Sequence, residues 1–289
     1  MIGELVMAAL SLFPPLGMQV KPDVSPHRVD NVIANGVRLS YLDWGGKGEA
    51  IIFLAGSGDT PHAFDELAPK FTNQYRVLGL TRRGFGASQR NVTDFDAVTL
   101  AKDLASFMDM RGIQKAHLVG HSAAGDELTQ FATDYTDRVL KLVYLDAAYN
   151  RSSILEMEKL NPIPDIPPTN LRLKAHYDAI DAYRPNFRAV RAPILSIYSI
   201  FESHWAIDEK TSPELRERAN AFVKDIVQPY QWGNIRGLKR AAPHAEVEVL
   251  RGTDHNFFEG KKFADWTFKR IARFLKKRDE KSDWCCPRL

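Results

Sequence analysis

The chain is poor in cysteine. Its only two cysteines, among 289 residues, are the adjacent pair Cys285-Cys286. They cannot cross-link distant segments, which excludes a disulfide framework, and no Cys/His cluster has zinc-ligand spacing. We therefore expect no metal and no other cofactor, and a reducing, cytoplasmic compartment is favoured. No internal repeat or low-complexity tract is evident.

The chain also lacks a strong charge of one sign and a long hydrophobic run. There are 39 Lys and Arg residues against 36 Asp and Glu, a formal net charge of +3, which is too balanced to indicate a nucleic-acid partner. The apolar stretch 1–18 is too short to span a bilayer, so no transmembrane segment is expected. It contains Glu4 and no basic n-region, so a signal peptide, which would mean a periplasmic or secreted protein, is poorly formed.

What is present is the alternation of strand-like and helix-like segments. A composition of 44% hydrophobic and 26% charged residues indicates a globular protein. Asn35-Gly36 separates two strand-like runs and predicts a tight hairpin. Further strands are expected at Ala50–Leu54, Tyr75–Leu80, Ala116–Val119, Leu140–Leu145, Pro193–Tyr198 and Glu246–Leu250. Helices are expected at about Pro61–Phe71, Val98–Met110, Ala123–Tyr135, Pro213–Val227 with a second piece up to about Arg240, and Lys261–Lys281. This order predicts a mostly parallel sheet.

The alternation of strands and helices stops over residues 147–191. Four prolines lie between two short helical pieces expected at Ile154–Leu160 and Leu171–Tyr183. A long excursion inside a compact domain is usually functional, so we interpret it as a small cap, with a long surface connection as the alternative. The expected organisation is a leader over 1–27, a core over 28–146 and 192–280, the cap over 147–191, and a tail over 281–289.

One stretch carries the clearest chemical signal. Residues 116–125 read AHLVGHSAAG, an apolar run that ends in a serine between small residues and continues as a helix. This strand–turn–helix pattern is typical of a nucleophilic serine on a strained turn, here Ser122. The N–H of Ala123 would point to where an oxyanion forms, at the positive end of the helix dipole.

A serine hydroxyl needs a base. His255 is the candidate, because it lies in the short loop between the last expected strand and the last helix, on the same sheet edge as Ser122. His121 is too close to Ser122 in sequence to turn back on it. The remaining histidines have no motif around them.

At this point the chain resembles the α/β-hydrolase superfamily over about residues 29–278. Four segments carry the resemblance, in the family's order: Phe53–Gly58, Arg83–Ser88, Gly120–Gly125 and Gly252–His255. The resemblance implies an α/β fold with a mostly parallel eight-stranded sheet, helices on both faces and a small helical cap. It also points to the esterase, lactonase and C–C hydrolase branch, because epoxide hydrolases and haloalkane dehalogenases carry aspartate where this chain has serine.

By similarity, the oxyanion hole consists of the N–H groups of Ser57 and Ala123. The family commonly places its acid after the strand Pro193–Tyr198, which favours Glu202, although some members use the preceding strand end, here Asp146. The chain departs from the family pattern in having Ala124 for a glycine, Ala55 for a histidine and Thr81 for an aspartate. The loop after Thr81 is interpreted as structural support.

The expected function is a cofactor-independent serine hydrolase that cleaves a small carboxylic ester or related acyl substrate, as a monomer or homodimer. Phe85, Tyr149, Phe201 and Trp205 could line its apolar pocket, with core packing as the alternative. Other activities of the same fold stay open: a C–C bond hydrolase, lactonase, perhydrolase or hydroxynitrile lyase. A ligand-binding or signalling protein with little turnover is the alternative from another class.

Overall fold

The computed structural model describes residues 25–163 and 170–277. The expected leader up to residue 24, the tail with Cys285-Cys286 and the prolines at 164, 167 and 168 lie outside the described residues.

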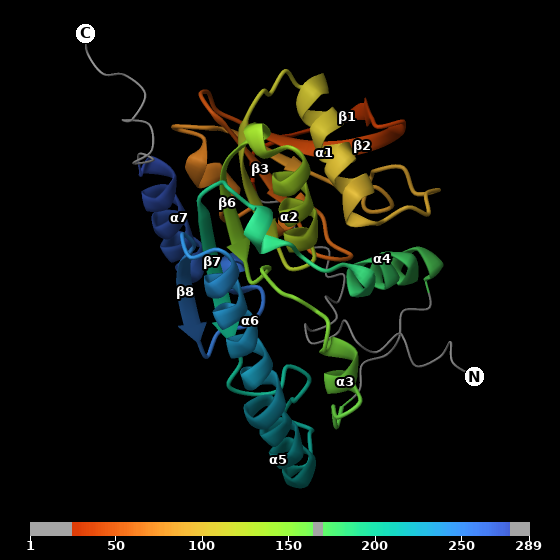
Figure 1. The fold of residues 1–289 in the computed structure, drawn as a ribbon, viewed down its shortest axis with the longest axis vertical. Coiled ribbons are helices and arrows are strands. Elements are labelled where there is room, and N and C mark those ends of the chain that lie inside the picture. Colours follow the sequence, from red (N-terminus) through yellow and green to blue (C-terminus); the bar gives the residue numbers. More distant parts are fainter. Residues whose placement is uncertain (1–24, 164–169, 278–289) are drawn as a thin grey trace.

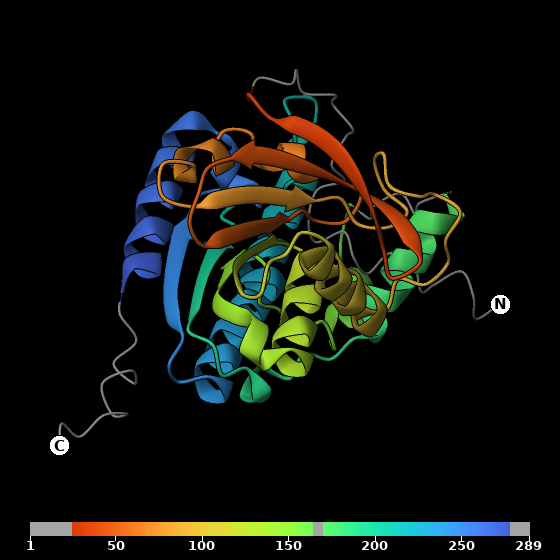
Figure 2. The same cartoon turned by 90° about the horizontal axis from the view of Figure 1, so that it is seen from above.

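Eight strands form a single sheet in the order β1-β2-β4-β3-β5-β6-β7-β8 (Figures 1 and 2). β2 pairs antiparallel with β1 and β4, and the strands from β4 to β8 are parallel. The strands are β1 (Arg28–Ala34), β2 (Val37–Gly45), β3 (Ala50–Leu54), β4 (Arg76–Leu80), β5 (Ala116–His121), β6 (Val139–Leu145), β7 (Ile194–Ile200) and β8 (Glu246–Arg251). The predicted, mostly parallel eight-stranded sheet is confirmed.

Helices cover both faces of the sheet (Figure 2). The α-helices are α1 (Ala97–Met110), α2 (Ala124–Asp134), α3 (Ile154–Glu158), α4 (Leu171–Ala182), α5 (Pro213–Phe222), α6 (Gln228–Ala241) and α7 (Lys261–Lys276). Helices α1, α2 and α6 pack on one face and α7 on the other. Alternating side chains of the central strand β3 divide between the two: Ile52 and Leu54 join the first core, and Ile51 and Phe53 the second. A parallel strand buried on both faces therefore reads as a continuous apolar run.

One expected helix differs in form, and the two helical pieces expected after β7 are joined by an irregular turn. The segment 61–71 forms two short 3₁₀ helices, Pro61–Phe64 and Ala68–Phe71, with a proline in the first turn of each. The helical region after β7 contains a π-helical turn at Val223–Val227 between α5 and α6. Pro229 follows in the first turn of α6. Because proline has no N–H to donate, a regular α-helical hydrogen-bond ladder is interrupted there.

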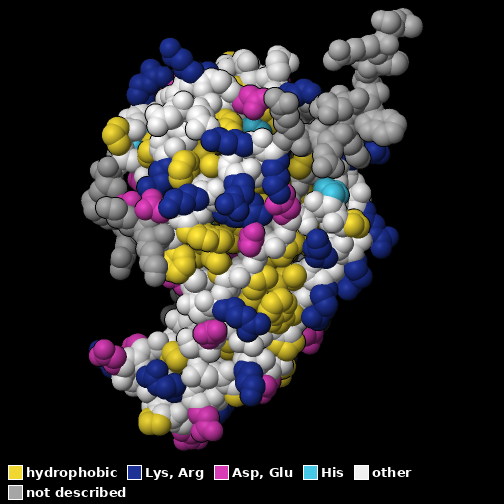
Figure 3. Space-filling view, turned by 90° about the vertical axis from the view of Figure 1, so that its left-hand side faces the viewer, with side chains coloured by type: hydrophobic (Ala, Val, Ile, Leu, Met, Phe, Trp, Pro, Cys, Tyr) yellow, Lys and Arg dark blue, Asp and Glu magenta, His cyan; other side chains and the backbone are white. Residues whose placement is uncertain are grey.

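The basic closing helix α7 is amphipathic. It buries Ile271, Phe274 and Leu275, while Arg270 on its outer side pairs with two glutamates of β8 at 2.6 and 2.7 Å. Figure 3 shows this side of the molecule, where Lys and Arg side chains lie among acidic and apolar ones. Across 25–163 and 170–277, no helix is both long and apolar enough to cross a membrane.

A third, smaller hydrophobic cluster lies apart from the two sheet cores. It joins Ile154 and Met157 of α3 to Phe201, Phe222, Val223 and Val227, which all come after β7. Helix α3, which lies within the segment 147–191, therefore packs against α5 and the π-helical turn. Figure 1 shows α5 and α6 as one long helical rod beside the sheet.

A buried ion pair fastens the loop after β4 to helix α1. Arg83 donates two hydrogen bonds of 2.6 Å to Asp103, and the two side chains are 5% and 3% exposed. Asn35, at the tip of the β1–β2 hairpin, donates to the same carboxylate at 2.8 Å. Asp103 thus holds three segments together, and removing it would leave a buried guanidinium without its partner.

We expect Asp103→Ala to lower the free energy of unfolding by about 3–5 kcal/mol, the usual cost of breaking a buried pair. Asp109→Ala on the same helix is the matched control. Asp109 is 66% exposed and pairs with Arg138, so its loss should cost less than about 1 kcal/mol. Urea unfolding measures both. Equal losses in the two variants would contradict the structural role given to Asp103.

Candidate active site

Ser122 occupies the sharp turn between β5 and α2. Its backbone φ is +54°, in the left-handed region that non-glycine residues rarely adopt. Its N–H donates to the carbonyl of Leu145 on the neighbouring strand at 3.2 Å, and its own carbonyl accepts from Gly125 at 3.0 Å. These bonds hold the strained conformation that the sequence motif predicted, with the side chain at the sheet edge.

Small residues make this turn possible. A Cβ atom at Gly120 would lie 3.2 Å from the Cβ of Ala124 and 2.9 Å from Leu128. At Gly125 it would lie 2.0 Å from the carbonyl oxygen of Ala147. Ala124 is thus accommodated in place of the family's glycine, whereas Gly125 has no room for any side chain.

His255 and Asp146 form a buried pair at the same edge. The Nδ1 of His255 lies 2.7 Å from Oδ2 of Asp146, and the side chains are 2% and 0% exposed. Asp146 follows β6 directly and also has a left-handed backbone, with φ +46°. With Nδ1–H donated to the carboxylate, Nε2 is the basic nitrogen of this histidine.

Two further donors hold the other oxygen of Asp146. The hydroxyl of Tyr149 donates to Oδ1 at 2.6 Å, and the backbone N–H of Ser199 does so at 3.1 Å. Burial raises the pKa of Asp146 to about 7, and these bonds oppose the rise. Burial, followed by the charge of Arg151, lowers the pKa of His255 well below its usual value. Burial therefore disfavours the charged form of each partner, whereas the hydrogen bonds from Tyr149 and Ser199 favour the ionised form of Asp146.

The geometry reverses the expected order of the two acid candidates. Glu202 is exposed, with its carboxylate beside Gly252, where a Cβ would lie 2.9 Å from Oε2. Asp146, not Glu202, contacts His255. Both residues follow neighbouring parallel strands, so position alone places them at one edge; the left-handed turn at Asp146 carries its side chain inward.

His121, next to the serine, supports the histidine loop. It is fully buried, and its Nε2 lies 3.2 Å from the carbonyl oxygen of His255. The two rings are 4.3 Å apart, and the His121 ring also packs on Phe258. Burial, and then the nearby His255, keeps the pKa of His121 well below its usual value, so it serves as a neutral donor. The position of His121 next to Ser122 argued against a role as base, and no sequence pattern indicated this supporting role.

The loop after β3 brings Ser57 to the site. A Cβ at Gly56 would lie 3.1 Å from the Cβ of Ser122, so this loop passes directly beside the serine. The guanidinium of Arg82 donates hydrogen bonds to the carbonyls of Ala55 and Gly56 at 3.0 and 3.1 Å. Arg82 is itself paired with Glu127 of α2 at 3.1 Å, and both are buried. The loop expected to be structural support thus fixes the peptide planes next to Ser57.

Helix α4, in the segment expected to form a cap, reaches the same loop through His176. This residue is 1% exposed, and its Nδ1 lies 3.1 Å from Oγ of Ser57. Its ring also packs against Phe85 at 5.1 Å. Burial, and then the charge of Arg82, lowers the pKa of His176 well below its usual value. A neutral histidine from α4 therefore contacts the segment expected to hold the oxyanion, a link that no motif indicated.

The other three aromatic residues expected in a pocket have different surroundings. Tyr149 is buried, with its hydroxyl on the acid and its ring stacked 5.9 Å from Tyr230. Phe201 and Trp205 pack together in the third cluster, at 5.9 Å. Phe85 is the one beside a residue that touches Ser57.

Comparison with known proteins agrees with this fold. Residues 49–172 match the family model described as the alpha/beta hydrolase fold. The solved structure of E-2-(acetamidomethylene)succinate hydrolase superposes with a TM-score of 0.64 over 87% of this chain and 100% of that one, at 16% identity. Naproxen esterase from Bacillus subtilis superposes with a TM-score of 0.60 over 93% and 94%, at 15% identity. The chain therefore has the α/β-hydrolase fold, and its residues 49–172 match that family's model.

Sequence relatives of this chain include a fluoroacetate dehalogenase from Burkholderia sp, 33% identical over 35% of this chain and 35% of the relative. Another is the 2-hydroxy-6-oxononadienedioate/2-hydroxy-6-oxononatrienedioate hydrolase of Burkholderia vietnamiensis, 37% identical over 40% of this chain and 42% of the relative. The chain matches only about a third of the length of the first curated relatives.

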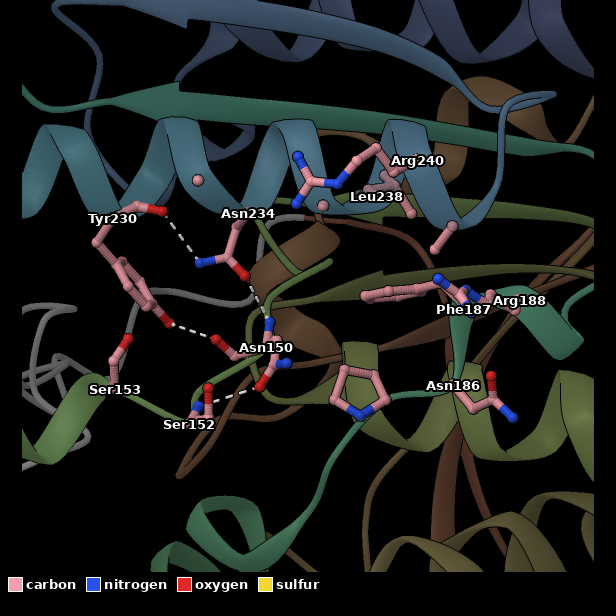
Figure 4. A pocket seen from close by; sticks show the side chains of 14 residues that line it. Asn150, Ser152, Ser153, Asn186, Phe187, Arg188, Tyr230, Asn234, Leu238 and Arg240 are labelled. Carbon is pink, nitrogen blue, oxygen red and sulfur yellow. Dashed lines mark hydrogen bonds between the residues drawn. The ribbon is translucent and has the colours of Figure 1, made fainter.

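A polar groove of about 430 Å³ lies between the loop after β6 and helix α6. Figure 4 shows how Asn150 is fastened there. Its N–H donates to Asn234 at 2.6 Å, and its carbonyl accepts from Tyr230 at 3.2 Å. Neither Ser122 nor His255 lines the groove. Its structural importance lies in Tyr230, which holds this loop and stacks on Tyr149.

We expect Tyr149→Phe to move the acid limb of the site's reactivity to higher pH. The Tyr149 hydrogen bond lowers the pKa of Asp146, so its loss raises that pKa, and the ionised acid disappears earlier as the pH falls. A hydrogen bond to a charged group is worth about 1.5–3 kcal/mol, or roughly 1–2 pH units. The rate of Ser122 labelling by a fluorophosphonate, followed against pH, measures the shift.

Tyr198→Phe is the control for this measurement. Tyr198 is also fully buried beside Tyr149, but its hydroxyl donates to the carbonyl of Ala148 and not to the acid. Its removal should leave the pH profile in place. The same shift in both variants would mean that the loss of a buried hydroxyl in this region, and not the loss of the hydrogen bond to Asp146, changes the pH dependence of labelling.

Proposed function

We propose that this protein is a serine hydrolase that cleaves a small carboxylic ester or a related acyl compound. The observation that carries the proposal is the 2.7 Å contact between buried His255 and Asp146, at the sheet edge where Ser122 sits on its strained turn. A serine, a histidine and an oriented carboxylate at one edge are the groups that acyl transfer requires.

In the proposed reaction, Oγ of Ser122 attacks the substrate carbonyl while Nε2 of His255 takes its proton. The N–H groups of Ser57 and Ala123 stabilise the oxyanion. The leaving alcohol takes the proton from His255, and an acyl-enzyme remains. His255 then activates water, which releases the acid and restores Ser122. Asp146 stabilises the imidazolium in both steps.

Other activities among the relatives fit less well. A dehalogenase and an epoxide hydrolase are among the relatives, but those enzyme classes carry an aspartate where this chain has Ser122. A C–C bond hydrolase keeps the serine, and one such relative is 37% identical in the matched part. It is the alternative within the fold, and substrate profiling separates it from an esterase.

We assign Phe85 and His176 to the substrate side of the proposed pocket. The ring of Phe85 lies against His176, whose Nδ1 contacts Ser57 of the proposed oxyanion hole. An apolar ring and a neutral imidazole suit an uncharged acyl group better than a charged one.

We expect Ser122→Ala to abolish hydrolysis of short- and medium-chain p-nitrophenyl esters, with kcat reduced by at least about 10³-fold. Circular dichroism and the melting temperature should stay near those of the wild type. Full activity in this variant would overturn the serine mechanism. A wild type that binds small molecules saturably but neither turns esters over nor reacts with a fluorophosphonate would instead favour the ligand-binding protein.

The identity of the acid is tested by a matched pair of amide substitutions. Asp146→Asn should reduce kcat by about 10⁴-fold at neutral pH, because the histidine loses its orienting carboxylate. Glu202→Gln, at the exposed position, should change kcat by no more than about twofold. Steady-state ester hydrolysis measures both, and a large loss confined to Glu202→Gln would reverse the assignment.

A further inference from the structure

A cluster of potential metal ligands lies outside the proposed active site. One ring nitrogen each from His27 and His62 and one carboxylate oxygen of Asp65 all lie within 4.8 Å of one another. The three side chains are partly exposed. His27 precedes β1, whereas His62 lies in the 3₁₀ helix Pro61–Phe64 and Asp65 ends it. We propose that these three residues bind a divalent transition metal, with Zn²⁺ as the representative ion.

The spacing of His62 and Asp65 already suits a shared metal. Nδ1 of His62 lies 3.0 Å from Oδ2 of Asp65. Two ligands that are each about 2.1 Å from one zinc ion are themselves about 3.0–3.4 Å apart. A metal can therefore replace the proton between these two atoms without a change in the backbone. The ring of His27, 5.1 Å from that of His62, needs only a side-chain adjustment to complete the set.

Hydrogen bonds around the cluster orient two of the ligands. Nδ1 of His27 lies 2.8 Å from the carbonyl oxygen of Ser25, which makes Nδ1 the protonated nitrogen and leaves the lone pair on Nε2. The hydroxyl of Ser25 donates to Oδ1 of Asp65 at 2.7 Å and accepts from the indole of Trp44 at 2.9 Å. Such partners on backbone carbonyls and carboxylates are typical of metal-binding histidines and acids.

The donor set selects the class of metal. Two imidazoles and one carboxylate suit Zn²⁺ and its transition-metal neighbours, whereas Ca²⁺ and Mg²⁺ prefer oxygen ligands only. Three protein ligands at a partly exposed position leave room for water as the fourth. Spacing along the chain does not indicate this cluster, because His27 lies 35 residues before His62.

The position of the cluster implies a structural role. Bound metal would tie the segment before β1 to the 3₁₀ helix that follows the loop of Ser57. Phe64 of that helix stacks on Phe258 at 5.2 Å, close to His255 in the chain. The metal would thus stabilise the folded protein, because a ligand that binds only the native state raises its stability. The proposed chemistry at Ser122 does not require it.

Zn²⁺ binding by the untagged full chain tests the proposal, in a background with Cys285→Ser and Cys286→Ser that removes competing thiolates. Equilibrium dialysis should give one Zn²⁺ per chain, and Zn²⁺ should raise the melting temperature relative to EDTA. His62→Ala should weaken Zn²⁺ binding by more than about 100-fold, beyond the 10–100-fold that loss of a supporting partner costs. It should also abolish the rise in melting temperature.

Asp65→Asn, which keeps the shape of the side chain, gives the same test if His62→Ala does not fold. His244→Ala is the matched control, since His244 lies outside the cluster and contacts the carbonyl of Ala192; it should bind Zn²⁺ like the background protein. Absence of stoichiometric binding would overturn the proposal. Binding that persists unchanged in both His62→Ala and Asp65→Asn would do the same, and His62–Asp65 would then be a hydrogen-bonded pair only.

Discussion

The site depends on two left-handed turns at the ends of neighbouring parallel strands. Ser122 follows β5 and Asp146 follows β6, and both have a positive φ. Each strained residue is held by a ladder bond to the next strand: Ser122 N–H to Leu145, and Asp146 N–H to Ile197. The sheet therefore bears the cost of a conformation that either residue would avoid in isolation. It also sets the spacing between the proposed nucleophile and its acid, since adjacent strands have a fixed separation.

Buried ion pairs hold the loops that surround these turns. Arg82 pairs with Glu127, and Arg151 pairs with Asp126, in the first turn of α2. Each pair connects the helix that begins at the elbow to a different loop of the same sheet edge. Such pairs add little net stability over an apolar contact, but they are costly to break because one charge is then left buried. Their contribution here is to position loops rather than to strengthen the core, and the acidic partners also favour the helix N-terminus.

The fold and two of the proposed catalytic residues could be predicted because their signals are local. Buried strands read as apolar runs, and the elbow needs small residues at fixed positions around Ser122. The acid could not be chosen, because Asp146 and Glu202 follow neighbouring strands and differ only in the direction of their side chains. His176 was missed for a similar reason: no sequence pattern connects helix α4, which carries it, to the loop of Ser57. Contacts between residues far apart in sequence depend on tertiary packing, which leaves no local pattern.

The separation of the third hydrophobic cluster from the two sheet cores has a consequence for how the molecule opens. Ile154, Met157 and their partners after β7 form a small unit with little apolar area to lose. Cooperative units with few buried contacts unfold locally at a lower free energy than the core. We therefore expect these elements to unfold locally at a lower free energy than β5 and β6, which hold the two strained turns, so that local opening leaves the geometry of the turns unchanged.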